Sequence, residues 1–159
     1  MMNARVATFL ALLCAASGLV LAHSAPNSFV KLTFGAHTVT AEVLVPESEL
    51  ALATAAEGAS EPIASYLSRH LSAETPQGAP WAVRVRSVRS ISYLEHSYLS
   101  ADVELAPPAG ASTSTFVLVD DAVTHEVRNH LVVVLARGDE NPTVLGALQY
   151  PARRLAISH

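Results

Sequence analysis

Histidines are the residues of this chain with the widest range of possible chemistry, and the first of them depends on processing. The chain has seven histidines and a single cysteine, Cys14. His23 directly follows Ala22, so a cut between the two would give His23 a free α-amine. The amine nitrogen and the imidazole Nδ1 could then chelate one ion, and this pair of nitrogens suits copper, nickel or zinc. Without the cut an amide nitrogen replaces the amine, so this hypothesis requires processing.

A second group of candidate ligands lies in the segment His125-Glu126-Val127-Arg128-Asn129-His130. The pattern predicts a strand over residues 125–136, on which residues five apart point to opposite faces, so one of the two histidines should face a given site. One of these imidazoles, with the amine and Nδ1 of His23, would form a T-shaped site known as a histidine brace. His70, near the end of a predicted helix, completes the candidate metal ligands, which we order His23, His130, His125, His70.

Each candidate also has an ordinary structural interpretation. His23 could be a frayed chain end, His130 a hydrogen-bonded core residue, and His70 a solvated or capping residue at a helix C-terminus. The other histidines are expected in a turn, at the surface and in the tail: His37, His96 and His159. Composition alone is therefore only a hint of metal binding.

Residues 1–22 have the three parts of a secretory signal peptide: a positive charge at Arg5, an apolar run and small residues before the cut. The apolar run is short for a bilayer span of roughly 20 residues. Cys14 follows two leucines, whereas a lipoprotein signal has small residues before its cysteine. We therefore expect a periplasmic or secreted protein with one domain, residues 23–159. That domain has no cysteine, so disulfides cannot stabilise it.

Charge and motifs argue against two classes of function. Removing the predicted signal peptide leaves a formal net charge of −5, and the only group of three neighbouring basic residues is Arg84, Arg86 and Arg89. Nucleic acid is therefore not an expected partner. A hydrolase is also not expected, because no Gly-x-Ser-x-Gly motif occurs and the predicted domain has no cysteine nucleophile.

Short alternating segments separated by turns predict a mainly β fold, an antiparallel, immunoglobulin-like β-sandwich of about seven strands. A short helical insertion is expected at residues 46–72, where Pro46 and Pro62 precede two segments with helical spacing. The expected strands are residues 28–34, 38–45, 81–86, 88–94, 99–105, 115–119, 125–136 and 144–150.

Several short motifs together resemble the extracytoplasmic N-terminal domain of HupE/UreJ-type membrane proteins. They are Ala22-His23, Ser28, Pro46 with Glu49-Leu50, Tyr66-Leu67 with His70, Gly78, Pro80-Trp81, Pro107-Pro108, His125, His130 and Gly138-Asp139. In that family the exported domain precedes a membrane domain related to nickel or cobalt permeases. Nothing after Tyr150 is apolar and long enough to span a membrane. We therefore expect either a truncated chain or a domain that works beside a separately encoded membrane protein.

The sequence thus predicts an exported metal-binding or metal-handling domain that uses a processed N-terminal histidine. Coordination chemistry favours copper, and the resemblance implies nickel. The alternative is a non-catalytic interaction module that docks on a membrane partner. A copper-dependent oxidase is a third option, but such an enzyme would normally present aromatic residues on a flat surface, and aromatic residues are only 6% of the chain.

Overall fold

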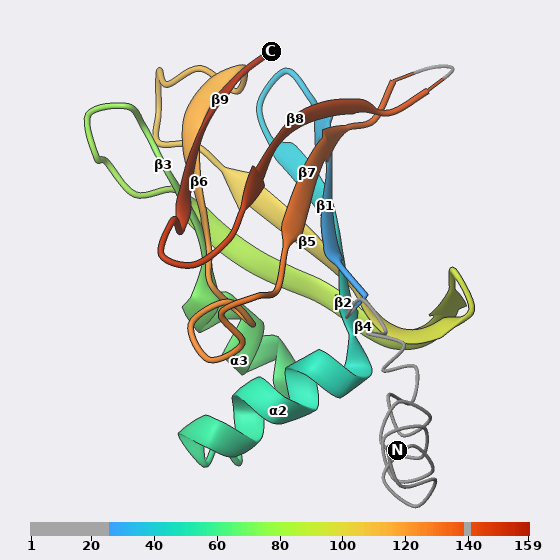
Figure 1. Ribbon diagram of the computed structural model, residues 1–159. Coiled ribbons are helices and arrows are strands. Elements are labelled where there is room, and N and C mark those ends of the chain that lie inside the picture. Colours follow the sequence, from blue (N-terminus) through green and yellow to red (C-terminus); the bar gives the residue numbers. More distant parts are fainter. Residues whose placement is uncertain (1–25, 139–140) are drawn as a thin grey trace, which may run out of the picture.

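Two β-sheets pack against each other, and two helices lie together at one end of them (Figure 1). The structure is a computed structural model that describes residues 26–138 and 141–159. His23 and the predicted signal peptide lie outside the described residues. None of the described helices is long and apolar enough to span a membrane.

The larger sheet has six strands in the order β4-β5-β2-β1-β7-β8. Its strands are β1 (Ser28–Phe34), β2 (Val39–Pro46), β4 (Ala82–Tyr93), β5 (His96–Ala106), β7 (Val132–Ala136) and β8 (Thr143–Leu148). The smaller sheet has the order β3-β6-β9, formed by β3 (Leu71–Glu74), β6 (Thr115–Asp120) and β9 (Arg154–Ser158). Neighbouring strands are antiparallel except β1 and β7, which run parallel.

The predicted mainly β, sandwich-like fold is confirmed, and the structure adds detail that the sequence pattern did not give. The two strands expected at residues 81–86 and 88–94 are one strand, β4, with a bulge between Val85 and Ser87. The short strands β3 and β9 were not expected, and the parallel β1–β7 pair makes the larger sheet mixed.

The core lies between the sheets and follows the alternation of the strands. In β1, Val30 and Leu32 are completely buried, whereas the neighbouring residue Thr33 is exposed to solvent. Trp81, just before β4, packs on Phe116 of the smaller sheet with ring centroids 4.6 Å apart. Each such apolar side chain contributes roughly 1.5–3 kcal/mol when it is fully buried. The core therefore holds the sheets together without disulfides.

The predicted helical insertion is confirmed as α2 (Glu47–Glu57) and α3 (Ile63–His70). Helix α2 ends because Gly58 adopts a left-handed conformation with φ of 64°, which glycine tolerates best. Helix α3 ends because Leu71 is extended and begins β3. These two endings leave Glu57 and His70 as the last residues of their helices.

The strand predicted over residues 125–136 is wrong in its first half, because β7 begins only at Val132. The carboxylate of Asp120 accepts a hydrogen bond from the Ala122 N–H at 3.0 Å, which starts a turn directly after β6. Further turns follow, closed by bonds from Val127 N–H to the Val123 carbonyl and from His130 N–H to the Val127 carbonyl. His125 and His130 therefore lie in a loop, which we call the 121–131 loop.

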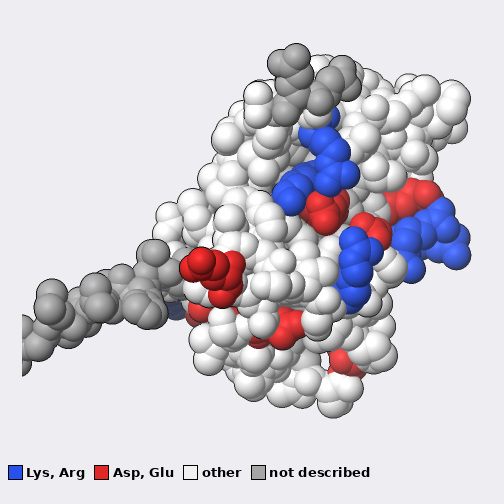
Figure 2. All heavy atoms as spheres, turned by 90° about the vertical axis from the view of Figure 1, so that its right-hand side faces the viewer, with Lys and Arg blue, Asp and Glu red and all other residues white. Residues whose placement is uncertain are grey.

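The outer face of the larger sheet carries neighbouring charges of both signs (Figure 2). Glu42 of β2 lies 3.5 Å from the Lys31 ammonium and 2.7 Å from the Arg137 guanidinium. Asp102 of β5 accepts a hydrogen bond from Arg89 of β4 at 3.1 Å. Exposed ion pairs of this kind are worth about 0–1 kcal/mol each, so they connect the strands only weakly.

Candidate metal centre

Glu57, His70 and His125 come together at the end of the sandwich that carries the helices. One ligand atom from each residue lies within 4.8 Å of the others. The Glu57 Oε1 atom is 2.8 Å from His125 Nε2 and 3.2 Å from His70 Nε2. The side chains of His70 and His125 are only 9% and 12% exposed, whereas that of Glu57 is 22% exposed. We call these three residues the Glu57 cluster.

Strand pairing explains why His70 and His125 meet although they are far apart in the sequence. Leu71, the first residue of β3, pairs with Asp120, the last residue of β6. The next bond of the ladder runs from the Asp121 N–H to the His70 carbonyl at 3.1 Å. The loop then turns, and His125 lies one helical turn beyond Asp121. Both imidazoles are thus positioned from the same residue, Asp121.

Asp121 holds the Nδ1 atoms of both histidines. The His70 Nδ1–H donates to Asp121 Oδ1 at 2.8 Å, and the His125 Nδ1–H donates to the Asp121 backbone carbonyl. Both acceptors are oxygens without hydrogen, so the proton of each neutral ring is on Nδ1 and the lone pair is on Nε2. Metal-ligating histidines commonly donate their second nitrogen to a carboxylate or a backbone carbonyl in this way.

The electrostatics of the site keep Glu57 ionised. The hydrogen bond from Arg69 holds the pKa of Glu57 below its usual value, desolvation opposes this shift, and a second proton on either histidine would lower the pKa further. Asp121 is fixed on its other side by Arg153, whose Nη1–H donates to Oδ2 at 2.9 Å. An anionic carboxylate therefore faces two Nε2 lone pairs.

Next to the site, burial raises the pKa of Asp120 to about 6, although the bond from the Ala122 N–H opposes this shift.

His125 Nε2 is buried and has no hydrogen-bond partner among the described residues. Glu57 Oε1 lies 2.8 Å from this nitrogen, but the angle at the nitrogen does not allow a hydrogen bond between them. The rings of His70 and His125 are stacked, with centroids 4.6 Å apart and planes 17° apart. Because the Nε2 lone pairs lie in nearly parallel planes, the rings must tilt for both Nε2 atoms to reach one ion.

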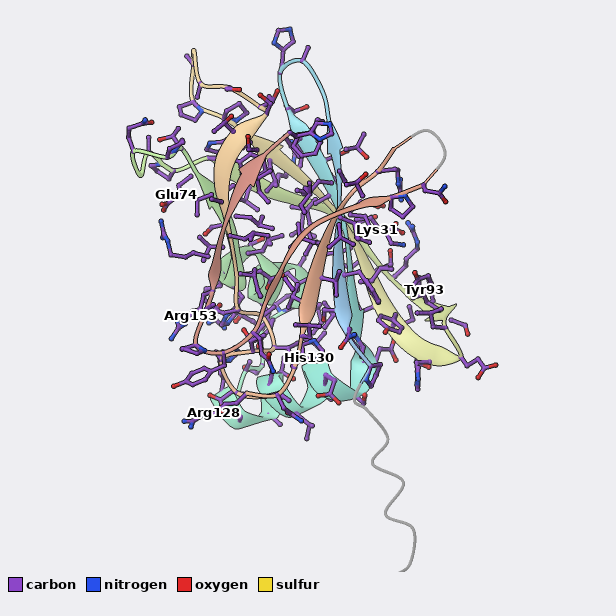
Figure 3. The ribbon with its side chains drawn as sticks, turned by 45° about the horizontal axis from the view of Figure 1, so that its top comes forward. Lys31, Glu74, Tyr93, Arg128, His130 and Arg153 are labelled. Carbon is purple, nitrogen blue, oxygen red and sulfur yellow. The ribbon has the colours of Figure 1, made fainter. Side chains whose placement is uncertain are left out.

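His130 is held elsewhere, in the core next to α2 (Figure 3). Its Nε2 atom lies 2.7 Å from the Ser28 hydroxyl, and its Nδ1 atom lies 4.0 Å from Glu49 Oε2. His130 is 1% exposed, and burial lowers its pKa to about 4. The structure thus separates His130 from His125 and gives it the hydrogen-bonded core position that was its structural alternative.

The other histidines that the structure describes lie outside the Glu57 cluster. His37 and His96 are exposed, and the ring of His159 stacks on Phe34 with centroids 4.1 Å apart. His23 lies outside the described residues, so the predicted brace stays a prediction.

Sequence reasoning missed Glu57, although a local signal pointed to it. Glu57 is the last residue of α2, where a carboxylate faces the negative end of the helix dipole. Such a placement is unfavourable by typically 0.3–1 kcal/mol, so helix stability does not favour an acid at this position. Two imidazoles and the guanidinium of Arg69 lie beside this carboxylate instead.

Comparison with known families and proteins adds no further indication, because no family model and no curated protein matches the chain. The resemblance to HupE/UreJ-type domains therefore stays a prediction, and the functional argument rests on the geometry of the site.

Proposed function

We propose that this domain binds one transition-metal ion through Glu57, His70 and His125. The observation that carries the proposal is the shared support from Asp121, which ties down both Nδ1 atoms and leaves both Nε2 lone pairs beside the Glu57 carboxylate. In a purely structural ion-pair cluster, an Nε2–H would be expected to point at the carboxylate. The unpartnered, buried His125 Nε2 supports the metal-binding interpretation instead.

Two imidazoles and one carboxylate suit copper, nickel or zinc. Affinity for nitrogen-rich sites rises from nickel to copper, so copper should bind more tightly in a direct titration. Three protein ligands leave at least one coordination position open, which is typical of sites that exchange ligands rather than of closed structural sites. This favours a metal-handling role, in which the ion is taken up and passed on.

Export and a membrane partner remain parts of this proposal. A domain that receives a metal ion outside the cell membrane could deliver it to a separately encoded transporter. The processed amine of His23, which the sequence predicts as a ligand, is the competing hypothesis for where the ion binds. The rival proposal, an interaction module without metal, is favoured by the broad outer face of the larger sheet, where cations and anions alternate (Figure 2).

The experiment is a calorimetric titration of Cu(II), Ni(II) and Zn(II) into chelator-treated protein. Wild type should bind one ion, and His70→Ala, His125→Ala or Glu57→Gln should weaken binding at least about 100-fold, more than the usual effect of an outer-shell partner. His96→Ala is the matched control, because His96 is exposed and outside the cluster. Unchanged affinity in all three cluster variants would refute the proposed site, and wild type that binds no metal would leave the interaction module.

A version with one extra residue before His23 separates the two metal hypotheses. The site proposed here should bind metal equally well with the extension. Binding that is lost on extension and unaffected by His125→Ala would place the ion at the N-terminus instead.

A further inference from the structure

Arg69 contacts two of the three residues that would bind the metal. Its Nη1–H donates to His70 Nε2 at 2.9 Å, and its Nη2–H donates to Glu57 Oε2 at 3.0 Å. The Nδ1 atom of His70 already carries the ring proton, because it donates to Asp121. Arg69 therefore uses the same Nε2 lone pair that a metal ion would need.

We propose that Arg69 is a built-in competitor of the metal, whose guanidinium holds the site when the ion is absent and must leave His70 Nε2 when the ion binds. This inference rests on the proposed function and concerns the regulation of the same site. A nitrogen lone pair can accept one N–H or coordinate one ion, so the two states exclude each other at this atom. A guanidinium beside the bound ion would also repel it.

The surroundings of Arg69 allow this exchange. Glu61 Oε1 accepts hydrogen bonds from both Nε and Nη2 of Arg69, and the Arg69 guanidinium lies over the Tyr66 ring at 5.4 Å from its centroid. These contacts do not involve His70, so Arg69 can give up His70 Nε2 and keep a position beside the site. The Arg69 side chain is 49% exposed, so its movement needs no opening of the core.

The exchange gives the site a means of releasing its ion. Without metal, Arg69 balances the charge of Glu57 and fills the acceptor position of His70. With metal, the ion takes over both roles, and the guanidinium stays nearby as a replacement. A competitor held within reach at high effective concentration weakens binding of the ion, which suits a domain that passes metal on.

The test is a Ni(II) titration of wild type, Arg69→Gln, Arg69→Lys and Arg153→Gln. Arg69→Gln should bind Ni(II) about tenfold more tightly, the size expected for loss of one charge-assisted contact. Arg69→Lys keeps the charge but cannot make the forked contact to His70 and Glu57, so it should also bind several-fold more tightly. Arg153→Gln removes the same charge beside Asp121 without freeing Nε2, and should bind no more tightly than wild type.

The outcomes separate this inference from the proposed function. If wild type binds Ni(II) through the Glu57 cluster but both Arg69 variants bind no more tightly, the competition is refuted and the site stands. Tightening in Arg69→Gln and Arg153→Gln alike, with Arg69→Lys unchanged, would also refute competition, because charge alone would then explain the effect. If neither wild type nor any variant binds Ni(II), the proposed function itself fails. Circular dichroism spectra that match wild type establish that each variant is folded.

Discussion

Acidification should destabilise this domain through His130. In the folded protein burial lowers the pKa of His130 to about 4, whereas in the unfolded chain it should be near the ordinary value of 6.5. Between these values the unfolded chain takes up a proton that the folded protein excludes. The stability that neutral His130 provides is therefore fully present above about pH 6.5, and it is lost as the pH falls toward 4.

The pKa difference sets the size of the effect. One pKa unit corresponds to about 1.4 kcal/mol, so the shift of His130 from 6.5 to about 4 amounts to about 3 kcal/mol in full. Linkage places about 2 kcal/mol of this loss between pH 7 and pH 5. Replacing His130 by glutamine removes the titration and keeps an amide near Ser28, so the variant should lack this part of the pH dependence.

The assay is urea unfolding at pH 7, 6 and 5 with chelator present, for wild type and His130→Gln. The free energy of unfolding of wild type should fall by about 2 kcal/mol more than that of the variant between pH 7 and pH 5. His96→Gln is the control, since His96 is exposed and should leave the pH dependence unchanged. Parallel pH profiles for wild type and His130→Gln would refute the reasoning.

Three further predictions concern the site and its supports. Asp121→Ala should weaken metal binding about 10–100-fold in calorimetry, because His70 loses its Nδ1 acceptor while His125 keeps a backbone carbonyl. Asp120→Asn should raise the free energy of unfolding at pH 7 by up to about 3 kcal/mol, since burial raises the pKa of Asp120 from 3.8 to about 6. This gain should shrink as the pH falls from 6 to 4 in urea unfolding, and a gain independent of pH would contradict it. Gly58→Ala should cost about 1 kcal/mol in thermal unfolding, because alanine is strained at φ of 64°; an unchanged midpoint would contradict it.

The local spacing of apolar residues and prolines was sufficient to predict most elements of the fold. Alternation located β1 and β2, and proline followed by helical spacing located both helices. It failed over residues 125–131, because the turn after β6 is set by the Asp120 side chain and by packing of the loop against α3 residue Tyr66, whose hydroxyl donates to the Ala122 carbonyl. Neither contact has a signature in the spacing of apolar residues.

The candidate site was predictable only in part. His70 and His125 were candidates by residue type, but their meeting depends on the pairing of Leu71 with Asp120, which is a long-range contact. Glu57 was missed because an acid near the end of a helix usually indicates only a solvated surface. His130 was ranked above His125, but it is buried in the core, where its Nε2 atom contacts the Ser28 hydroxyl.

The central claim is tested most directly by the electron paramagnetic resonance spectrum of one equivalent of Cu(II) bound to the protein. The account predicts a single copper species with two imidazole nitrogens, one of which is lost in His70→Ala and one in His125→Ala, while His96→Ala and an N-terminal extension leave the spectrum unchanged. A spectrum that is the same in wild type, His70→Ala and His125→Ala would contradict the account.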